Sequence, residues 1–385
     1  MAKISLDGLD AMQYDVLKEI GNIGAGNATT ALSKMLSIKM DMSVPNVALL
    51  PFQDISSVIG SEDQTVVGIL LGIEGDIDGM MMFLFDMKSA HHLVNSLMMR
   101  DVTTDEDLGA ESFTEIEMSA LNEIGNIVSG SYLNALSSLT NLKMICTVPS
   151  LTVDMVGALL SVPAAEFGKY GDKLLMIQSE FGEMDFGITW YVRLKIFFSL
   201  REKFVPQAVF LETVKIRKKN GQLYMGNMIK VGMADLKVCK CPDALTTLGL
   251  GSCVGVALYD PVTKVSGLLH CMLPDSTQIR NNSNVAKFAD TGIDELIRQM
   301  ENLGASKSRL VAKMAGGAQM FAMASQNESL RVGERNAAAA RAKLKEYRIR
   351  LLAEDCGLNY GRTVEFYSET GDYVIKSVGK PQKTI

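Results

Sequence analysis

The sequence predicts an α+β fold in which an N-terminal α/β domain, duplicated about a pseudo-twofold axis, precedes a C-terminal α/β domain with a strand-rich core. Three observations predict it: a repeat in the first half, a change to short strands from Met228, and 47% hydrophobic residues in a chain of 385. We expect the first domain at 1–204, a linker at 205–226 and the second domain at 227–385.

The first half repeats itself at a fixed offset. Shifting the sequence by 104 residues places Glu19–Ile23 on Glu123–Ile127 without a gap. The same shift pairs Gly26 with Gly130, Ala31–Ser33 with Ala135–Ser137, Lys39–Met40 with Lys143–Met144 and Val44–Pro45 with Val148–Pro149. Self-similarity of this kind indicates an internal duplication. We expect the two copies at about 8–100 and 112–204.

Each copy contains an amphipathic helix with a Glu and an Asn one turn apart. In the first copy the apolar stripe is Met12, Val16, Ile20 and Ile23, beside a polar flank of Asp15, Glu19 and Asn22. In the second copy the stripe is Ile116, Leu121, Ile124 and Ile127, and the flank is Ser119, Glu123 and Asn126. The sequence therefore predicts two similar polar faces.

Glycines interrupt the first of these helices. Gly21, Gly24 and Gly26 each cost about 1 kcal/mol relative to alanine in a helix, so something must approach that backbone closely. One interpretation is tight packing of the two related helices, or a helix interrupted by a turn. The other is a site in which Glu and Asn orient a water and meet a cation, as attack on an acyl phosphate requires.

The duplicated pattern resembles the CheC phosphatase family of bacterial chemotaxis. The residues that carry the resemblance are Asp15, Glu19, Asn22 and Pro45, with Ser119, Glu123, Asn126 and Pro149. It implies two active sites, in which each Asn positions the water that attacks the phospho-aspartate of CheY and each Glu grips the regulator's lysine. It also implies that this chain binds no metal, since the response regulator brings Mg²⁺. Residues 184–204 do not resemble the closing strand and helix of that family.

A cysteine and a histidine face each other in the second half. Val254–Tyr259 and Val265–Met272 are predicted strands, and Asp260–Pro261 is typical of the turn between them. If Asp260 pairs with Thr263, Cys253 lies directly opposite His270 on one face. Small residues share that face (Gly255, Ala257 and Ser266), while the other face forms core (Val254, Val256, Leu258, Val265 and Leu269).

This pair favours nucleophilic attack on a carboxamide. A thiol within reach of an imidazole gains thiolate character, and the thiolate attacks the carbon and releases ammonia. Backbone N–H groups of Gly249–Cys253 would stabilise the intermediate. Thr247 is the candidate that orients the imidazole, with Thr246 and Ser252 as alternatives. The structural alternative is a buried cysteine with a histidine that serves packing.

The same segment resembles the CheD receptor glutamine deamidases. The residues that carry the resemblance are Thr247–Cys253, His270 and Leu273–Ser276. The spacing of Thr247, Cys253 and His270 fits that family's catalytic triad. Further matches are Lys287–Asp290, Gly316–Phe321, Gly333–Asn336 and Glu354–Gly357, so that the likeness covers 228 to about 378, with Leu358 as a departure.

Together the resemblances imply one chain that deamidates chemoreceptor glutamines and dephosphorylates CheY. The implied partners are methyl-accepting chemotaxis receptors, phosphorylated CheY, and the two domains for each other. In the family the phosphatase domain occupies the receptor-binding surface of the deamidase, so we expect an intramolecular complex with lowered deamidase activity.

Other functions are disfavoured. The net charge of −6 argues against nucleic acid, and the apolar run Met80–Phe85 is too short to span a membrane, so we expect a cytoplasmic protein with thiols rather than disulfides. Cys239 and Cys241 lack a second pair for zinc. A non-catalytic adaptor that binds phosphorylated CheY or the flagellar switch and docks on receptors is the main rival. A metal-dependent hydrolase is a weaker one, because the adjacent His91 and His92 face different ways on a helix.

Overall fold

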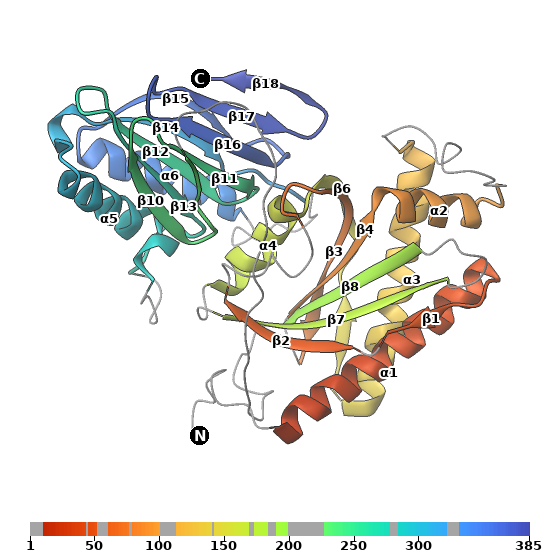
Figure 1. Cartoon of the computed structure of the whole chain (residues 1–385). Helices are drawn as coiled ribbons and strands as arrows, with labels where there is room; N and C mark the ends of the chain where they lie inside the picture. Colours follow the sequence, from red (N-terminus) through yellow and green to blue (C-terminus); the bar gives the residue numbers. More distant parts are fainter. Residues whose placement is uncertain are drawn as a thin grey trace.

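The computed structural model has two halves that lie side by side, with one helix between them (Figure 1). It describes residues 11–43, 45–51, 61–76, 79–100, 113–140, 142–168, 173–183, 190–198, 227–277, 284–321 and 331–385. The expected linker at 205–226 lies outside the described residues. No helix of the described part is long and apolar enough to cross a membrane.

The N-terminal half is one eight-stranded sheet with helices α1 and α3 packed against each other and against the sheet (Figure 1). Its strand order is β1-β7-β8-β4-β3-β5, with β2 also on β7 and β6 also on β3. The elements are α1 (Ala11–Leu36), β1 (Asp41–Met42), β2 (Asn46–Pro51), β3 (Thr65–Gly75), β4 (Gly79–Asp86), α2 (Met87–Leu97), α3 (Glu115–Thr140), β5 (Met144–Cys146), β6 (Ser150–Met155), α4 (Val156–Gly168), β7 (Lys173–Glu183) and β8 (Trp190–Phe198).

The sheet confirms the duplication, because the two copies exchange strands. β1 and β2 of the first copy pair with β7 of the second, and β5 and β6 of the second pair with β3 of the first. β4 and β8 pair at the centre, where the pseudo-twofold axis must pass. Strand β8 also lies in the stretch 184–204 that did not resemble the expected closing strand, so a strand is present there after all.

Tight packing accounts for two of the α1 glycines. A Cβ atom at Gly24 would overlap the ring of Tyr132 on α3, and one at Gly21 would lie 2.8 Å from Ile177 Cγ2. A Cβ atom at Gly26 would have only the Met42 sulfur within 4 Å, at a distance of 3.9 Å. Tight packing of the two related helices is therefore confirmed at Gly24, whereas Gly21 packs against Ile177 of strand β7 instead of against the other helix.

The C-terminal half contains two five-stranded sheets, ordered β10-β13-β12-β14-β15 and β18-β17-β16-β11-β9. Helices α5 and α6 share a core with one face of the first sheet. The elements are β9 (Met228–Lys230), β10 (Asp235–Lys240), β11 (Ala244–Leu250), β12 (Val254–Asp260), β13 (Val265–Cys271), α5 (Ala289–Asn302), β14 (Val311–Gly316), α6 (Val332–Glu346), β15 (Arg350–Cys356), β16 (Arg362–Tyr367), β17 (Tyr373–Ser377) and β18 (Lys380–Thr384).

One hydrophobic core runs through both halves. It joins Leu159 and Leu160 of α4 to Leu250 and Cys253 of the second half. Because buried residues of both halves contact one another in this core, the two halves are packed together rather than merely tethered.

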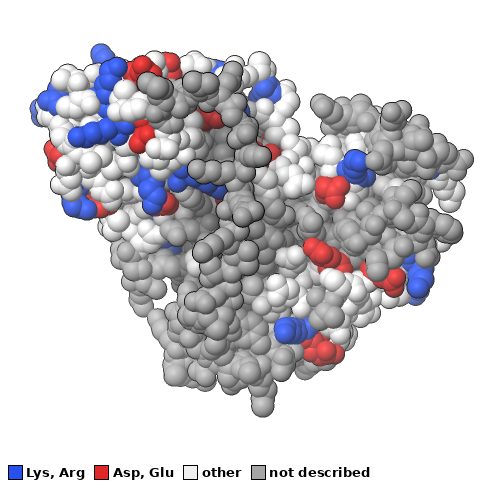
Figure 2. Space-filling view, viewed as in Figure 1, with Lys and Arg blue, Asp and Glu red and all other residues white. Residues whose placement is uncertain are grey.

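The surface charge of the C-terminal half is mixed. On the face drawn in Figure 2, its Lys and Arg side chains lie among Asp and Glu side chains.

Candidate active sites

The β12–β13 hairpin has a longer loop than the sequence predicted. Asp260 pairs with Val265, not Thr263, so His270 pairs with Gly255 and the expected register is wrong by two residues. The Asp260 carboxylate accepts the N–H groups of Val262 and Thr263, at 3.0 and 3.5 Å, which removes Thr263 from the ladder. Four loop residues follow Asp260, and the last, Lys264, has a φ of 51°.

Cys253 and His270 nevertheless share a face. Side chains alternate along a strand, so an error of two residues keeps every side chain on its expected side. Cys253, one residue before β12, is thus a diagonal neighbour of His270, and such neighbours lie within reach of each other. Cys253 packs with Ala257 and Leu268, whereas Cys271 packs on the opposite face with Val254, as expected.

The hydroxyl of Thr247 contacts the imidazole of His270. The hydroxyl oxygen lies 2.7 Å from His270 Nδ1 and 2.8 Å from the carbonyl oxygen of Val231. A threonine has one hydroxyl proton, and a carbonyl can only accept, so the hydroxyl donates to Val231 and accepts from Nδ1–H. The proton on Nδ1 leaves Nε2 as a lone pair, and Nε2 has no partner among the described residues. That nitrogen is free to act as a base.

Burial keeps the pair neutral in this conformation. Cys253 and His270 are 0% and 1% exposed. Burial, followed by the nearby Cys271, raises the pKa of the Cys253 thiol well above its usual range. Burial, with a smaller contribution from Lys230, lowers the pKa of His270 to about 3. The expected thiolate character of the sulfur is therefore absent while the site is closed, because a dry pocket penalises both charges.

Helix α4 of the N-terminal half covers the loop that precedes Cys253. The Ser252 N–H donates to Ser161 Oγ at 2.9 Å, and the Ser252 hydroxyl donates to the Ser161 carbonyl at 3.1 Å. A Cβ atom at Gly251 would overlap the Ala158 carbonyl oxygen, and Gly249, with a φ of 65°, approaches α4 just as closely. Glycines at these positions allow the helix to lie directly on the loop backbone.

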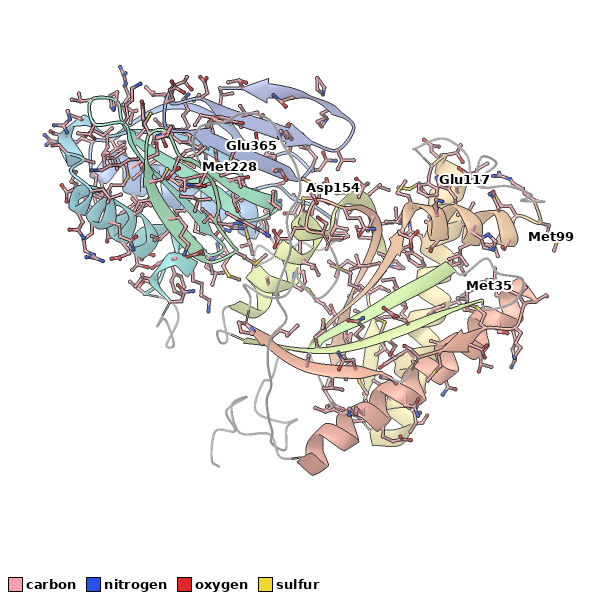
Figure 3. All side chains as sticks on the ribbon, in the orientation of Figure 1. Met35, Met99, Glu117, Asp154, Met228 and Glu365 are labelled. Atoms are coloured by element: carbon pink, nitrogen blue, oxygen red, sulfur yellow. The ribbon has the colours of Figure 1, made fainter. Side chains whose placement is uncertain are left out.

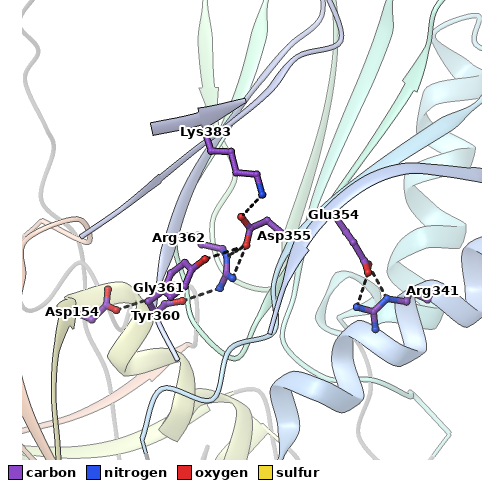
Figure 4. Close-up of polar contacts among 8 residues, drawn as sticks. All are labelled: Asp154, Arg341, Glu354, Asp355, Tyr360, Gly361, Arg362 and Lys383. Carbon is purple, nitrogen blue, oxygen red and sulfur yellow. Dashed lines mark hydrogen bonds and ion pairs between the residues drawn. The ribbon is translucent and has the colours of Figure 1, made fainter. Parts of the chain in front are cut away.

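A second contact fixes the start of α4. Asp154, at the end of β6, accepts the Gly361 N–H at 2.8 Å (Figures 3 and 4). Burial raises the pKa of this carboxyl despite the two backbone N–H groups that it accepts. Beside it Arg362 is fully buried and bonded to Asp355 at 2.7 Å (Figure 4). No sequence pattern predicts the hydrogen bond between Gly361 and Asp154, because the two residues are 207 positions apart.

The duplicated helices present their polar residues to solvent. Glu19 and Asn22 on α1 are exposed, as are Glu123 and Asn126 on α3. The side chain of Asp15 lies outside the described part. An open groove runs between the two helices, and eight of its lining residues form four pairs at the 104-residue offset: Asn27 with Ser131, Thr30 with Asn134, Ala31 with Ala135 and Lys34 with Ser138. The groove therefore follows the pseudo-twofold symmetry.

The cysteines and histidines considered as metal ligands, Cys239, Cys241, His91 and His92, lie within the described ranges. No group of three or more His, Cys, Asp or Glu side chains there could hold a metal ion. Cys239 lies 3.1 Å from the Ser368 hydroxyl and, like Cys241, is a free thiol. His91 stacks on Phe113, with ring centroids 4.1 Å apart.

Models of two protein families match different parts of the chain. A model of the CheC-like family matches 12–49 and 116–153, and a model described as CheD chemotactic sensory transduction matches 272–377. The structure of Thermotoga maritima FliY resembles 49% of this chain and 90% of its own, with 21% identity and a TM-score of 0.39, and we base no argument on that likeness.

Two curated relatives match the second half over their whole length. The probable chemoreceptor glutamine deamidase CheD of Lachnoclostridium phytofermentans is 68% identical over 161 residues, which is 42% of this chain and 100% of the relative. The chemoreceptor glutamine deamidase CheD of Halalkalibacterium halodurans is 51% identical over 162 residues, again 42% of this chain and 100% of the relative. The chain therefore belongs to the CheD family and carries an N-terminal CheC-like domain.

Proposed function

We propose that the C-terminal half deamidates glutamine side chains of chemoreceptors, with Cys253 as nucleophile, His270 as base and Thr247 as the residue that orients the base. The observation that carries the proposal is the Thr247–His270 hydrogen bond, because it leaves the lone pair of Nε2 on the face that Cys253 shares. The names of the curated relatives, which are chemoreceptor glutamine deamidases, support the substrate class.

The reaction follows from these groups. Nε2 of His270 takes the Cys253 proton, and the thiolate attacks the carboxamide carbon of the glutamine. Backbone N–H groups of the Gly249–Cys253 loop receive the negative oxygen of the intermediate. The imidazolium returns its proton to the amide nitrogen, which leaves as ammonia, and a thioester remains. Water, deprotonated by Nε2, attacks the thioester and yields glutamate and the free thiol.

We propose further that α4 holds this half in a restrained state. Ser161 takes the Ser252 N–H, which is one of the loop donors that the intermediate needs. The cover also keeps Cys253 and His270 dry and neutral. A receptor must therefore displace α4 before the thiolate forms, and the tether keeps α4 at high local concentration.

The N-terminal half is proposed to dephosphorylate CheY at two sites. Asn22 and Asn126 would orient the attacking water, while Glu19 and Glu123 would contact the regulator, which brings its own Mg²⁺. The match to the CheC-like family and the exposure of all four side chains support this role.

A matched pair of cysteine variants tests the deamidase. We expect Cys253→Ala to abolish ammonia release from a purified chemoreceptor fragment, and Cys271→Ala to retain it, because Cys271 lies on the opposite face of the sheet. Circular dichroism checks that both variants fold. Ammonia release by folded Cys253→Ala at the wild-type rate would refute the mechanism.

A second pair tests the phosphatase. We expect Asn22→Ala with Asn126→Ala to slow the loss of phosphate from CheY at fixed Mg²⁺. The control replaces Asn27 and Asn134, exposed residues of the same type on the same helices. If both double variants lose CheY phosphate at the same rate, the N-terminal half is a non-catalytic adaptor. The adaptor hypothesis also predicts that the full chain releases no ammonia.

A further inference from the structure

We propose that Asn336 is a positioning residue for deamidation, because its side-chain amide fixes the peptide plane that joins Ser252 to Cys253. The inference rests on the proposed role of Cys253. Asn336 lies near the start of α6, and its side chain is 0% exposed. None of the steps described above uses it. Burying an asparagine amide is costly unless hydrogen bonds compensate, and here Nδ2 makes two of them while Oδ1 has no partner among the described residues.

The amide bridges two backbone segments. Nδ2 of Asn336 donates to the Ser252 carbonyl oxygen at 3.0 Å and to the Met272 carbonyl oxygen at 2.9 Å. Ser252 immediately precedes the proposed nucleophile, and Met272 follows the proposed base by two residues. The two N–H groups of one amide lie in a fixed plane. Asn336 therefore sets the spacing between the segments that carry the nucleophile and the base.

These two carbonyl oxygens need an outside donor because the ladder stops there. The last β12–β13 pair is Val254 with Cys271. Beyond it the Met272 N–H donates to the Lys287 carbonyl at 3.0 Å, and the Ser252 N–H donates to Ser161. Buried carbonyl groups are normally paired, and one amide satisfies both. The opposite orientation of the amide would point its oxygen at two carbonyl oxygens, so the network assigns the orientation.

Holding the Ser252 carbonyl has a consequence for the nucleophile. A peptide unit is planar and trans, so the Cys253 N–H points away from the Ser252 C=O. Fixing one fixes the direction of the other, which is the loop N–H nearest the sulfur. The Cys253 carbonyl is held separately by the Gly317 N–H at 2.7 Å. Of the two donors that hold the Ser252 and Cys253 carbonyl groups, only Asn336 is a side chain that substitution can remove.

The test is Asn336→Asp in the full chain. This change keeps the shape but turns the two donors into an oxygen that repels both carbonyl groups. Misplacing a donor or a reacting group lowers kcat by about 10²-fold or more, so we expect that loss in ammonia release from a chemoreceptor fragment. The KM for the receptor stays within about twofold, because a residue that acts only on the reaction step leaves ground-state binding unchanged. The control is Ala340→Gly, one turn further along α6, which weakens the helix but keeps the bridge.

A second variant covers a failure to fold. Asn336→Ser retains a single donor in a smaller side chain, and activity is expressed per folded molecule from circular dichroism. If kcat per folded molecule equals the wild-type value in either variant, the inference is overturned. The same holds if KM rises while kcat stays constant. Wild-type release by Cys253→Ala would instead overturn the proposed function itself.

Discussion

One methyl group at Gly361 tests whether the N-terminal half restrains the deamidase. Gly361 lies between β15 and β16, and its N–H donates to Asp154. A Cβ atom there would overlap the Ala158 Cβ atom and lie 2.7 Å from Asp154 Oδ1. Gly361→Ala therefore introduces a clash that exists only while α4 is docked on the second half.

The size of the effect follows from the clash. Overpacking costs about 1–3 kcal/mol, which shifts an equilibrium between docked and undocked states by about 5- to 150-fold. Gly361 touches none of the proposed triad residues in the contacts described. We therefore expect kcat/KM for ammonia release from a chemoreceptor fragment to rise by a factor in that range, because the variant spends more time undocked.

The matched control is Gly232→Ala in the same half, where an added Cβ atom would meet only the Asp235 Cβ atom at 4.0 Å. Both variants are compared with the wild type by ammonia release and by thermal unfolding. If Gly361→Ala lowers the unfolding temperature of the docked form but releases ammonia at the rate of the control, restraint by α4 is refuted.

Two further predictions concern stability. Between pH 6.5 and about 3 the unfolded chain binds a proton at His270 that the folded chain excludes. The free energy of unfolding therefore decreases as the pH is lowered through this range. From pH 7 to pH 5 this group alone accounts for about 2 kcal/mol. Urea unfolding of His270→Gln should show a correspondingly smaller loss, and equal losses would contradict the buried neutral imidazole. At the helix crossing, Gly24→Ala should lower the free energy of unfolding by about 1–3 kcal/mol, because the added methyl overlaps Tyr132. Gly130→Ala should not lower the free energy of unfolding, because a Cβ atom there would meet nothing within 4 Å. Equal free energies of unfolding for the two variants would show that the helix crossing tolerates the methyl group at Gly24.

Sequence patterns predicted the repeat and the shared face of the hairpin because both depend on local periodicity. In the structure the two copies at the 104-residue offset exchange strands, since β2 of the first copy pairs with β7 of the second and β6 of the second pairs with β3 of the first. The face of Cys253 survived a register error because side chains alternate with a period of two. The error itself came from Asp260, whose carboxylate binds loop N–H groups and the Arg309 guanidinium. Although burial opposes them, these contacts hold the pKa of Asp260 below its usual range.

Features that depend on distant contacts were not predictable from the sequence. The Gly249–Cys253 loop was expected to offer its N–H groups to the intermediate, yet α4 packs on the loop and Ser161 accepts the Ser252 N–H. Burial, which depends on the folded surroundings, raises the pKa of the Cys253 thiol, so the thiolate character expected from a nearby imidazole is absent in this conformation. Asn336 lies in the stretch Gly333–Asn336, which resembles the CheD family. Its hydrogen bond to the Met272 carbonyl could not be predicted, because the two residues are 64 positions apart.

Hydroxylamine distinguishes deamidation through a thioester on Cys253 from direct attack of water on the glutamine. Hydroxylamine competes with water for a thioester and converts it to a hydroxamate, whereas direct attack of water on the glutamine yields only glutamate. Mass spectrometry of a chemoreceptor fragment treated with the full chain and hydroxylamine reads out the product. We predict hydroxamate at the modified glutamines with wild-type protein and with Cys271→Ala, and none with Cys253→Ala. Glutamate alone with the wild type, or hydroxamate with Cys253→Ala, would contradict the account.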